Sequence, residues 1–368
     1  MNDERGTALI ATLSLTMILL PLGAFVVMQC CTDLMIEHNV RAEVESFYVA
    51  EAGLEHALAE IPPDSTFAPL LAGPDHIAGT VDDGVFPFVE GAPGDFPCAP
   101  FHYDVRVNAA NGGMVSVVSA GSGLHGANKA VSALVSRSPL PFTPAALHAG
   151  GDAGTLDLGP GYLLSGLDHR LDDDPSQPQG PATALPALSG SRPDREELLR
   201  ARLTPAEAQR LVGAGGPPSI ATTPSLDVQA YANRYSQHPA RVRLAAVTLQ
   251  PDLILGTTQS PQVSVVTGDV DITGHLDGTG VLIVQGTLQV TGSLHFAGLV
   301  IAQGFLFQSS SHVAVAGAVW QAPGDDAHLQ LDGSGSVVYS SDALATIDRA
   351  FPGLLPHAAL LAGWQEQL

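Results

Sequence analysis

The hydrophobic pattern of the chain begins with one long apolar stretch close to the N-terminus. No charged residue occurs between Gly6 and Thr32, and the apolar run extends from Ala8 to Cys31. As an α-helix rising about 1.5 Å per residue, this run spans roughly 36 Å, which exceeds the roughly 30 Å hydrocarbon core of a bilayer. Its threonine and serine side chains can bond to carbonyls of their own helix, so lipid tolerates them. The pattern predicts a membrane-spanning helix over residues 8–31.

The helical pattern continues beyond the apolar run as an amphipathic segment. Apolar residues recur there at intervals of three and four, which places them on one helix face. Pro62-Pro63 then ends the helix, so we expect one helix over residues 7–61. A secretory signal peptide differs, because its apolar region is shorter, about 7–15 residues, and precedes a small-residue cleavage site. The apolar face consists of Phe47, Ala50, Leu54, Ala57, Leu58 and Ile61.

Pro21 lies inside the apolar half of this helix. Its ring removes one backbone hydrogen bond and collides with the carbonyl of Met17, which predicts a kink. Two interpretations remain open. Either the kink serves packing against other helices, or the proline is simply tolerated in a membrane helix.

Alternating apolar and polar residues predict three antiparallel strands between residues 101 and 137. Asn111-Gly112-Gly113 is a strong hairpin signal between the first two. Together with the loop-rich segment before them, the strands form an expected β head over residues 62–138, packed against the polar half of the helix. Residues 121–126 match G-x-G-x-x-G, but no acidic residue lies about 20 positions further on, so a hairpin loop is favoured over a dinucleotide site. The alternating apolar positions are Tyr103, Val105, Val107, Val115, Val117, Val131, Ala133 and Val135.

We expect residues 139–240 to connect the β head to a further domain. A proline-rich linker opens this connector, short β segments are expected around residues 156–158 and 162–164, and helices are predicted over residues 192–212 and 226–235. An acidic loop, residues 168–174, offers carboxylates beside His169. Such oxygens suit Ca²⁺, but the loop lacks the ligand spacing, central glycine and terminal glutamate of an EF-hand. A solvated turn is the favoured interpretation.

An internal repeat occupies residues 241–341. Similar segments that each begin with glycine recur at one fixed spacing, at 268–274, 286–292 and 304–310. Equal spacing, short alternating strands and glycine corners are typical of stacked coils, none of which can bury its apolar row alone. The repeat predicts a parallel β-helix, or β-roll, of about four to five rungs. Residues 342–368 are mildly helical and are expected to cap its open end.

Charge excludes two classes of partner. The chain has 37 acidic and 15 basic residues, for a formal net charge of −22. This balance argues against nucleic-acid binding through a basic surface and against a polybasic contact with an anionic membrane. The apolar fraction of 45% argues against disorder, and the 39 glycines and 28 prolines favour a turn-rich, β-rich fold.

The three cysteines do not form a disulfide framework. Cys30 and Cys31 are adjacent, so a bond between them would be badly strained. Cys98 has no obvious partner in the sequence. A buried free thiol is favoured for Cys98 over a disulfide to another chain.

No catalytic, cofactor-binding or metal-binding residue is predicted in the repeat. A glycan-cleaving β-helix needs paired carboxylates or a carboxylate with a basic partner. Asp269 and Asp271 share a strand face, but no Lys or Arg occurs between Arg243 and Arg349, so these acids are expected to be polar surface groups. Three histidines fall on successive coils at spacings of 20 and 17 residues. Because these spacings differ from the length of the repeat, the histidines are not expected to stack into a metal-binding row. They are His275, His295 and His312. We therefore do not expect an enzyme.

The N-terminus carries a series of motifs in a fixed order. A short charged leader ending in Arg5-Gly6 precedes the apolar helix, and N-x-R and F-Y-x-A-E-A-G-L follow it. These features resemble the N-terminus of PilX-type minor pilins, which belong to the type IV pilin and pseudopilin group. The resemblance covers about residues 4–61. The residues that carry it after the apolar run are Asn39, Arg41, Phe47, Tyr48, Glu51 and Gly53.

The resemblance implies processing and assembly. A prepilin peptidase would remove the leader, residues 1–6, between Gly6 and Thr7. Pilins usually carry a glutamate at the fifth mature position, where this chain has Ala11. A carboxylate in lipid is costly, and in pilins it docks to the amino terminus of a neighbouring subunit. A subunit at the tip has no preceding neighbour to dock to. The absence of this carboxylate therefore favours a tip or initiating role.

These patterns together predict an α+β protein. A long N-terminal transmembrane and amphipathic helix would pack on a small antiparallel sheet, followed by a C-terminal parallel β-helix with 18-residue repeats. The expected role is a structural minor pilin or pseudopilin-like subunit of a type IV pilus or type II secretion pseudopilus. Its expected partners are other pilins, prepilin peptidase, the bacterial inner membrane before assembly and a surface contact afterwards. The alternative is a membrane-anchored β-helix protein that binds or cleaves glycans.

Overall fold

The chain forms two compact units. The first comprises Met1–Ile61, Phe67–Ser136 and Ala359–Leu368, and the second comprises Pro62–Thr66 and Arg137–Ala358. The computed structural model describes residues 3–73, 75, 77–88, 101–123, 126–150, 156–171, 178–190, 193–222, 226–244, 252–324 and 328–367.

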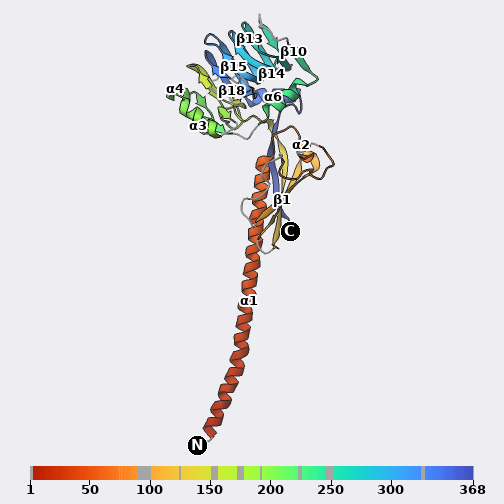
Figure 1. Ribbon diagram of the computed structural model, residues 1–368, viewed down its shortest axis with the longest axis vertical. Helices are drawn as coiled ribbons and strands as arrows, with labels where there is room; N and C mark the ends of the chain where they lie inside the picture. The colour runs from red at the N-terminus through yellow and green to blue at the C-terminus, as the bar shows by residue number, and fades with distance from the viewer. Residues whose placement is uncertain are drawn as a thin grey trace. The chain divides into compact units, whose positions relative to one another are not determined.

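The first unit is a long helix packed on an antiparallel sheet, as Figure 1 shows for α1 and β1. Helix α1 runs without a break from Asp3 to Glu60 and ends directly before Ile61-Pro62, as the sequence predicts. Pro21 lies inside it. The sheet has the strand order β1-β2-β3-β19. The other elements are α2 (Ala68–Leu71), β1 (His102–Ala109), β2 (Val115–Ser122), β3 (Asn128–Pro141) and β19 (His357–Gln367).

The predicted hairpin between β1 and β2 is confirmed. Ala109 pairs with Val115 in the antiparallel register, and a short 3₁₀ turn, Asn111–Gly113, joins the strands. Gly112 and Gly113 both have φ of 73°, in the left-handed region that glycine adopts without strain. All eight alternating apolar positions predicted from the sequence are buried. They form one core with the inner face of α1.

Strand β19 corrects the prediction of a helical cap over residues 342–368. Among the described residues of this stretch, helix is confined to α6, Ser341–Ala350, and residues 357–367 are a strand that joins the sheet of the first unit beside β3. Pro352 and Pro356 prevent the helix from continuing. The alanines and leucines after them favour a helix only weakly, and pairing with β3 overrides that preference.

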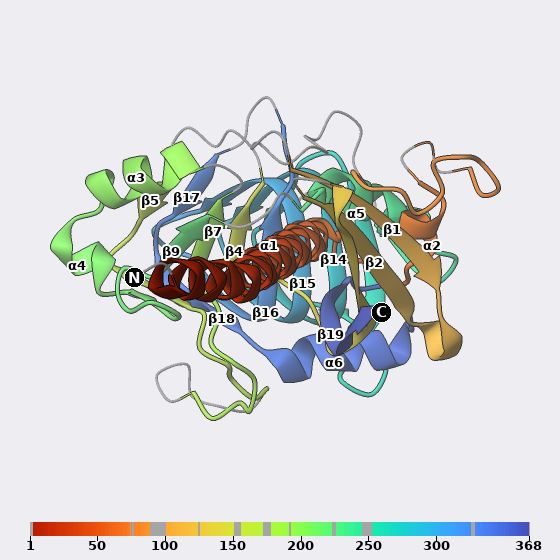
Figure 2. The same ribbon diagram turned by 90° about the horizontal axis from the view of Figure 1, so that it is seen from below.

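The second unit is built from parallel strands in which each segment pairs with the corresponding segment of the next repeat. Leu276 pairs with Leu294, and Leu294 pairs with Val313, so the sequence offset is 18 at the first step and 19 at the second. Figure 2 shows β14, β15 and β16 side by side. We call this arrangement the parallel stack. Its strands from the predicted repeat are β10 (Arg241–Leu244), β11 (Leu253–Leu255), β12 (Gln262–Thr267), β13 (Val270–Ile272), β14 (His275–Val290), β15 (Ser293–Phe307), β16 (His312–Gln321), β17 (Leu329–Leu331) and β18 (Ser334–Tyr339).

The expected connector is not a separate segment, because its strands extend the parallel stack. β4 pairs in parallel with β16, β5 with β17 and β6 with β18, and β7, β8 and β9 then add to these. Two of these strands, β5 and β6, lie where short strands are expected, at residues 156–158 and 162–164. The short length of the other four and their lack of an 18-residue period hid them from the pattern. The six strands are β4 (Leu147–Ala149), β5 (Leu156–Leu158), β6 (Gly161–Ser165), β7 (Leu188–Gly190), β8 (Leu211–Val212) and β9 (Ile220–Thr222).

The helix predicted over residues 192–212 is divided in the structure. Helix α3 (Pro193–Arg202) ends, and α4 (Pro205–Ala208) begins at a new capping box in which Thr204 accepts from the Glu207 backbone. The proline at the first turn and the capping threonine both favour this new start. The helix predicted over residues 226–235 is α5 (Val228–Ser236), capped by Asp227.

Helix α6 lies across the parallel stack and does not close its end as predicted. It contacts β14, β15 and β16, which belong to three successive repeats. Leu344 and Ile347 are its buried apolar contacts. Gly298 makes the approach possible, because a Cβ there would lie 2.8 Å from Ile347 Cδ1.

Candidate functional site

The N-terminal half of α1 presents an exposed and largely apolar surface. Among the helices in the described ranges, α1 alone has the length and composition to cross a membrane, and none of its apolar window is buried. Thr12 Oγ1 donates to Leu9 O, and Thr16 Oγ1 donates to Thr12 O, each at 2.9 Å, so these hydroxyls are satisfied within the helix as predicted. The large exposed side chains include Leu13, Met17, Leu20, Leu22, Phe25, Val27 and Met28.

The C-terminal half of α1 is fixed to the sheet by a row of small residues. Ser46 is buried in this row, and its hydroxyl donates to Ala42 O on the helix and to Ala127 O beyond it, both at 2.8 Å. The second bond links the helix to the start of β3. Small side chains let the helix backbone approach the strands closely. The row is Ala42, Ser46, Ala50, Gly53 and Ala57, all buried.

Two glycines mark the closest contact between helix and sheet. A Cβ on Gly53 would lie 2.6 Å from Ser119 Oγ and 2.6 Å from Tyr103 Cγ. A Cβ on Gly121 of β2 would collide with the backbone of Ala50. Neither position has room for a side chain, so the helix position along the sheet is fixed by shape.

The C-terminal strand contributes contacts that the sequence did not predict. The Trp364 and Phe47 rings meet edge to face with centroids 6.1 Å apart. Lys129 Nζ lies 3.3 Å from a Glu366 carboxylate oxygen and 3.9 Å from one of Glu43. These contacts join α1, β3 and β19. Residues 357–367 show no apolar–polar alternation, so no strand signal marked them in the sequence.

The residues of the N-terminal motif differ in their exposure. Phe47 and Gly53 pack against the sheet, Glu51 is half-buried, and Asn39 and Tyr48 are exposed. Arg41 Nε pairs with Glu45 on the next turn at 3.0 Å, in an exposed position. Gly6 and Thr7, the predicted cleavage pair, lie within the first turns of α1.

The cysteines agree in part with expectation. Cys30 and Cys31 are exposed on α1 and are free thiols. Cys98 lies outside the described residues, so the structure does not bear on its expected burial.

The acidic loop is not a solvated turn at its start. Asp168 is buried, and its carboxylate accepts from Ser341 N, Ser341 Oγ and Ala182 N at 2.7–2.8 Å. His169 is also buried, with Nε2 3.0 Å from Ser165 Oγ. The loop therefore holds the start of α6 against the connector. Residues 172–174 lie outside the described part of the chain.

Three histidines and one carboxylate gather on the outer face of the parallel stack, contrary to the expectation that unequal spacing separates them. The rings of His275 and His295 have centroids 5.1 Å apart, and those of His295 and His312 are 5.5 Å apart. The spacings of 20 and 17 differ from the pairing offsets of 18 and 19 by two positions in each case. Because side chains return to the same strand face at every second position, a shift of two keeps the rings together on that face.

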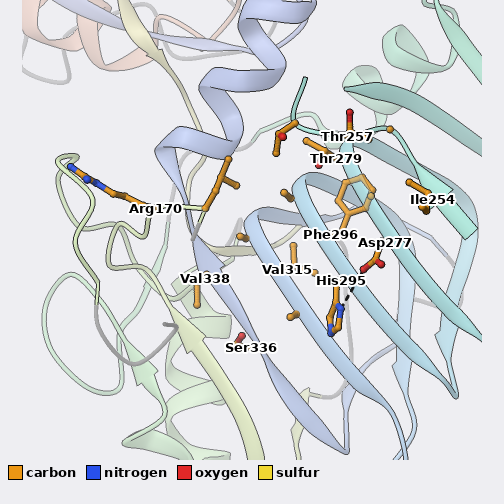
Figure 3. Close-up of a pocket in the computed structure, with 17 residues that line it drawn as sticks. Arg170, Ile254, Thr257, Asp277, Thr279, His295, Phe296, Val315, Ser336 and Val338 are labelled. Carbon is orange, nitrogen blue, oxygen red and sulfur yellow. Dashed lines mark ion pairs between the residues drawn. The ribbon is translucent and has the colours of Figure 1, made fainter. Parts of the chain in front are cut away.

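Asp277 lies between two of these imidazoles. Its Oδ2 is 2.8 Å from His275 Nε2, and its Oδ1 is 3.3 Å from His295 Nδ1. Asp277 and His295 also line a hollow of about 470 Å³ whose wall includes Thr279 and Phe296 (Figure 3). His275, Asp277 and His295 form the one group of potential metal ligands found among the described residues.

Several titratable groups of the second unit have altered pKa values, His148 and Asp64 among them. Burial lowers the pKa of His148 to about 4, and its Nδ1 lies 2.9 Å from Ser189 Oγ. Burial alone would raise the pKa of Asp64. Hydrogen bonds from Arg234 and from the Ser65 backbone outweigh that effect and hold the pKa below its usual range.

Comparison with known proteins gives little further information. No family model matches the chain, and no curated protein matches it. Among solved structures, the chain is similar to the competence-associated pilin ComZ from Thermus thermophilus, with 15% sequence identity and a TM-score of 0.22. That similarity covers 89% of this chain and 97% of ComZ. A likeness at this TM-score carries no argument about the present chain.

Proposed function

We propose that the chain is a minor pilin or pseudopilin-like subunit of the PilX type, which assembles with other subunits through α1. The observation that supports this most is the division of one continuous helix into two halves. The first half exposes mainly apolar side chains, and the second is locked to an antiparallel sheet by Ser46, Ala50 and Gly53. An exposed apolar helix is stable only in lipid or among other apolar helices. The same surface would therefore serve first as a membrane anchor and then as a filament contact.

Processing is part of the proposal. Prepilin peptidase would cut between Gly6 and Thr7, leaving a mature helix that begins with the apolar segment. Ala11, at the fifth mature position, provides no carboxylate for the amino terminus of a preceding subunit. This supports a position at the tip of the filament.

The parallel stack would act as the exported head. We propose that it is a short β-helix with an 18-residue period, supported by the sequence offsets of 18 and 19 between paired strands. Stacked repeats create extended surfaces that suit binding. Other pilins, prepilin peptidase and the inner membrane would be partners of α1, and a surface or its glycans would be a partner of the head.

Expression with and without prepilin peptidase tests this function. With the peptidase we expect a mature N-terminus at Thr7, and a Gly6→Val variant should remain uncut while its head folds normally. Labelled heads should appear in sheared filaments and at their ends. An uncut chain that never enters filaments would contradict the proposal and favour the membrane-anchored glycan-binding or glycan-cleaving alternative. Heads distributed along the shaft would contradict the tip position alone.

A further inference from the structure

Two adjacent columns of polar side chains run up the outer face of the parallel stack. Pairing places His275, Ser293 and His312 one above another in β14, β15 and β16. At the next position on the same strand face, Asp277 pairs with His295. The residues between them, such as Leu276 and Leu294, are buried. The polar side chains therefore point outward together from rigidly paired strands.

The three side chains nearest one another have the composition of a metal site. One ligand atom from each of His275, Asp277 and His295 lies within 4.8 Å of the other two. Their side chains are 37%, 47% and 44% exposed, so an ion can reach them from solvent. Metal–ligand bonds of about 2.0–2.2 Å place neighbouring ligands roughly 3–3.5 Å apart, so small side-chain rotations suffice to close the set.

We propose that His275, Asp277 and His295 bind one divalent transition-metal ion of the Zn²⁺ class. Two imidazole nitrogens and one carboxylate oxygen suit zinc and its neighbours, which accept three protein ligands and keep a water in the remaining position. Ca²⁺ and Mg²⁺ fit poorly, because they prefer shells made of oxygen. The carboxylate also partly neutralises the charge of the ion, and the acidic chain as a whole attracts cations.

Ser293 positions one of the ligands. Its Oγ lies 2.5 Å from His275 Nδ1, on the side of the ring away from Asp277. When the ring donates Nδ1–H to this hydroxyl, the lone pair of Nε2 is free to bind the ion. Metal-bound histidines are commonly held in this way through their second nitrogen. The remaining coordination position would open toward the hollow that Asp277 and His295 line.

Titration of the full chain in detergent micelles, after removal of metals by chelation, tests this inference. We expect Zn²⁺ to bind at one ion per chain by calorimetry, and Co²⁺ to give the d–d absorption of a nitrogen- and oxygen-ligated ion. The variants His275→Gln, Asp277→Asn and His295→Gln should each weaken binding by at least about 10-fold. Ser293→Ala should weaken it by about 10-fold or more without abolishing the Co²⁺ spectrum.

His312→Gln is the matched control. His312 lies on the same face, its Nδ1 also contacts a serine hydroxyl, Ser334 Oγ at 3.1 Å, and it stands outside the group of three ligands. We expect its Zn²⁺ affinity to stay within about twofold of the parent. Absence of saturable binding, retention of binding in all three ligand variants, or equal loss in His312→Gln would each overturn the proposal. Circular dichroism shows whether each variant is folded. The outcome is independent of prepilin processing.

Discussion

Gly53 and Gly23 occupy the same helix in opposite surroundings. A Cβ on Gly53 would meet Ser119 and Tyr103 at 2.6 Å, whereas a Cβ on Gly23 would meet nothing within 4 Å. We expect Gly53→Ala to destabilise the first unit by about 1–3 kcal/mol, because neighbouring groups must move. Gly23→Ala should be neutral or stabilising by up to about 1 kcal/mol, since alanine favours the helix. Thermal unfolding of both variants in the same detergent checks this, and equal shifts in Tm would contradict it.

His148 makes the stability of the second unit depend on pH. Its folded pKa is about 4 and its ordinary value is 6.5, so the unfolded chain binds the proton more readily. Stability from this residue is therefore complete above pH 6.5 and decreases as the pH falls toward 4. The loss is expected to reach about 3 kcal/mol at most. Histidine NMR provides the direct check, because an imidazole that titrates near its ordinary pKa in the folded protein would contradict the prediction.

At the residue scale, the sequence predicted burial better than it predicted proximity. Alternation identified all eight core positions of β1, β2 and β3, because a half-buried strand repeats at every second position. The clustering of His275, His295 and His312 was not predicted, although their spacing in the sequence is compatible with it. A spacing that differs from the pairing offset by two residues keeps a side chain on the same strand face. The pairing offsets, 18 and 19, have to be known before the spacings can be compared with them.

At the scale of elements, α6 shows how the stack is covered. Ile347 is fully buried against Gly298, whereas Arg349, on the outer side of the same helix, is exposed. We expect Ile347→Ala to cost about 2–5 kcal/mol, since it leaves a cavity beside three repeats. Arg349→Ala should change the unfolding free energy by less than about 0.5 kcal/mol. Urea unfolding measures both, and a small effect of Ile347→Ala would show that α6 does not support the stack.

Element prediction succeeded where a single period extends over a long stretch of chain. Helix α1 and the repeat both have such periods, and the structure contains the long helix and the paired offsets. Strands β4, β7, β8 and β9 are only two or three residues long, too short for a period to be visible. They exist because β4 pairs with β16, β7 and β9 then extend from β4, and β8 pairs with β6. Tertiary pairing of this kind is not encoded in the local pattern.

At the scale of the whole molecule, β19 links the end of the chain to the unit that contains α1. Truncation after Ala358 removes all but the first two residues of this strand and with it the Trp364 and Glu366 contacts. We expect faster amide hydrogen exchange in β3 and in the adjoining sheet, because β3 becomes an open edge. Exchange in β14 to β16 should be unchanged and serves as the internal control. Unaltered protection of β3 would show that β19 contributes nothing to the sheet.

The route of the chain through the parallel stack has a consequence for how the protein folds. Strands from β12 to β16 join partners in the adjacent repeat, so the loops they close are short. β4 must find β16, and most of the second unit lies in sequence between the paired residues Leu147 and Val319. Closing so long a loop is slow, and its entropic cost is repaid only when a finished edge is available. The C-terminal repeat should therefore fold first and provide the edge on which β4 and the strands after it pair last. The order of folding would then be the reverse of the order of translation.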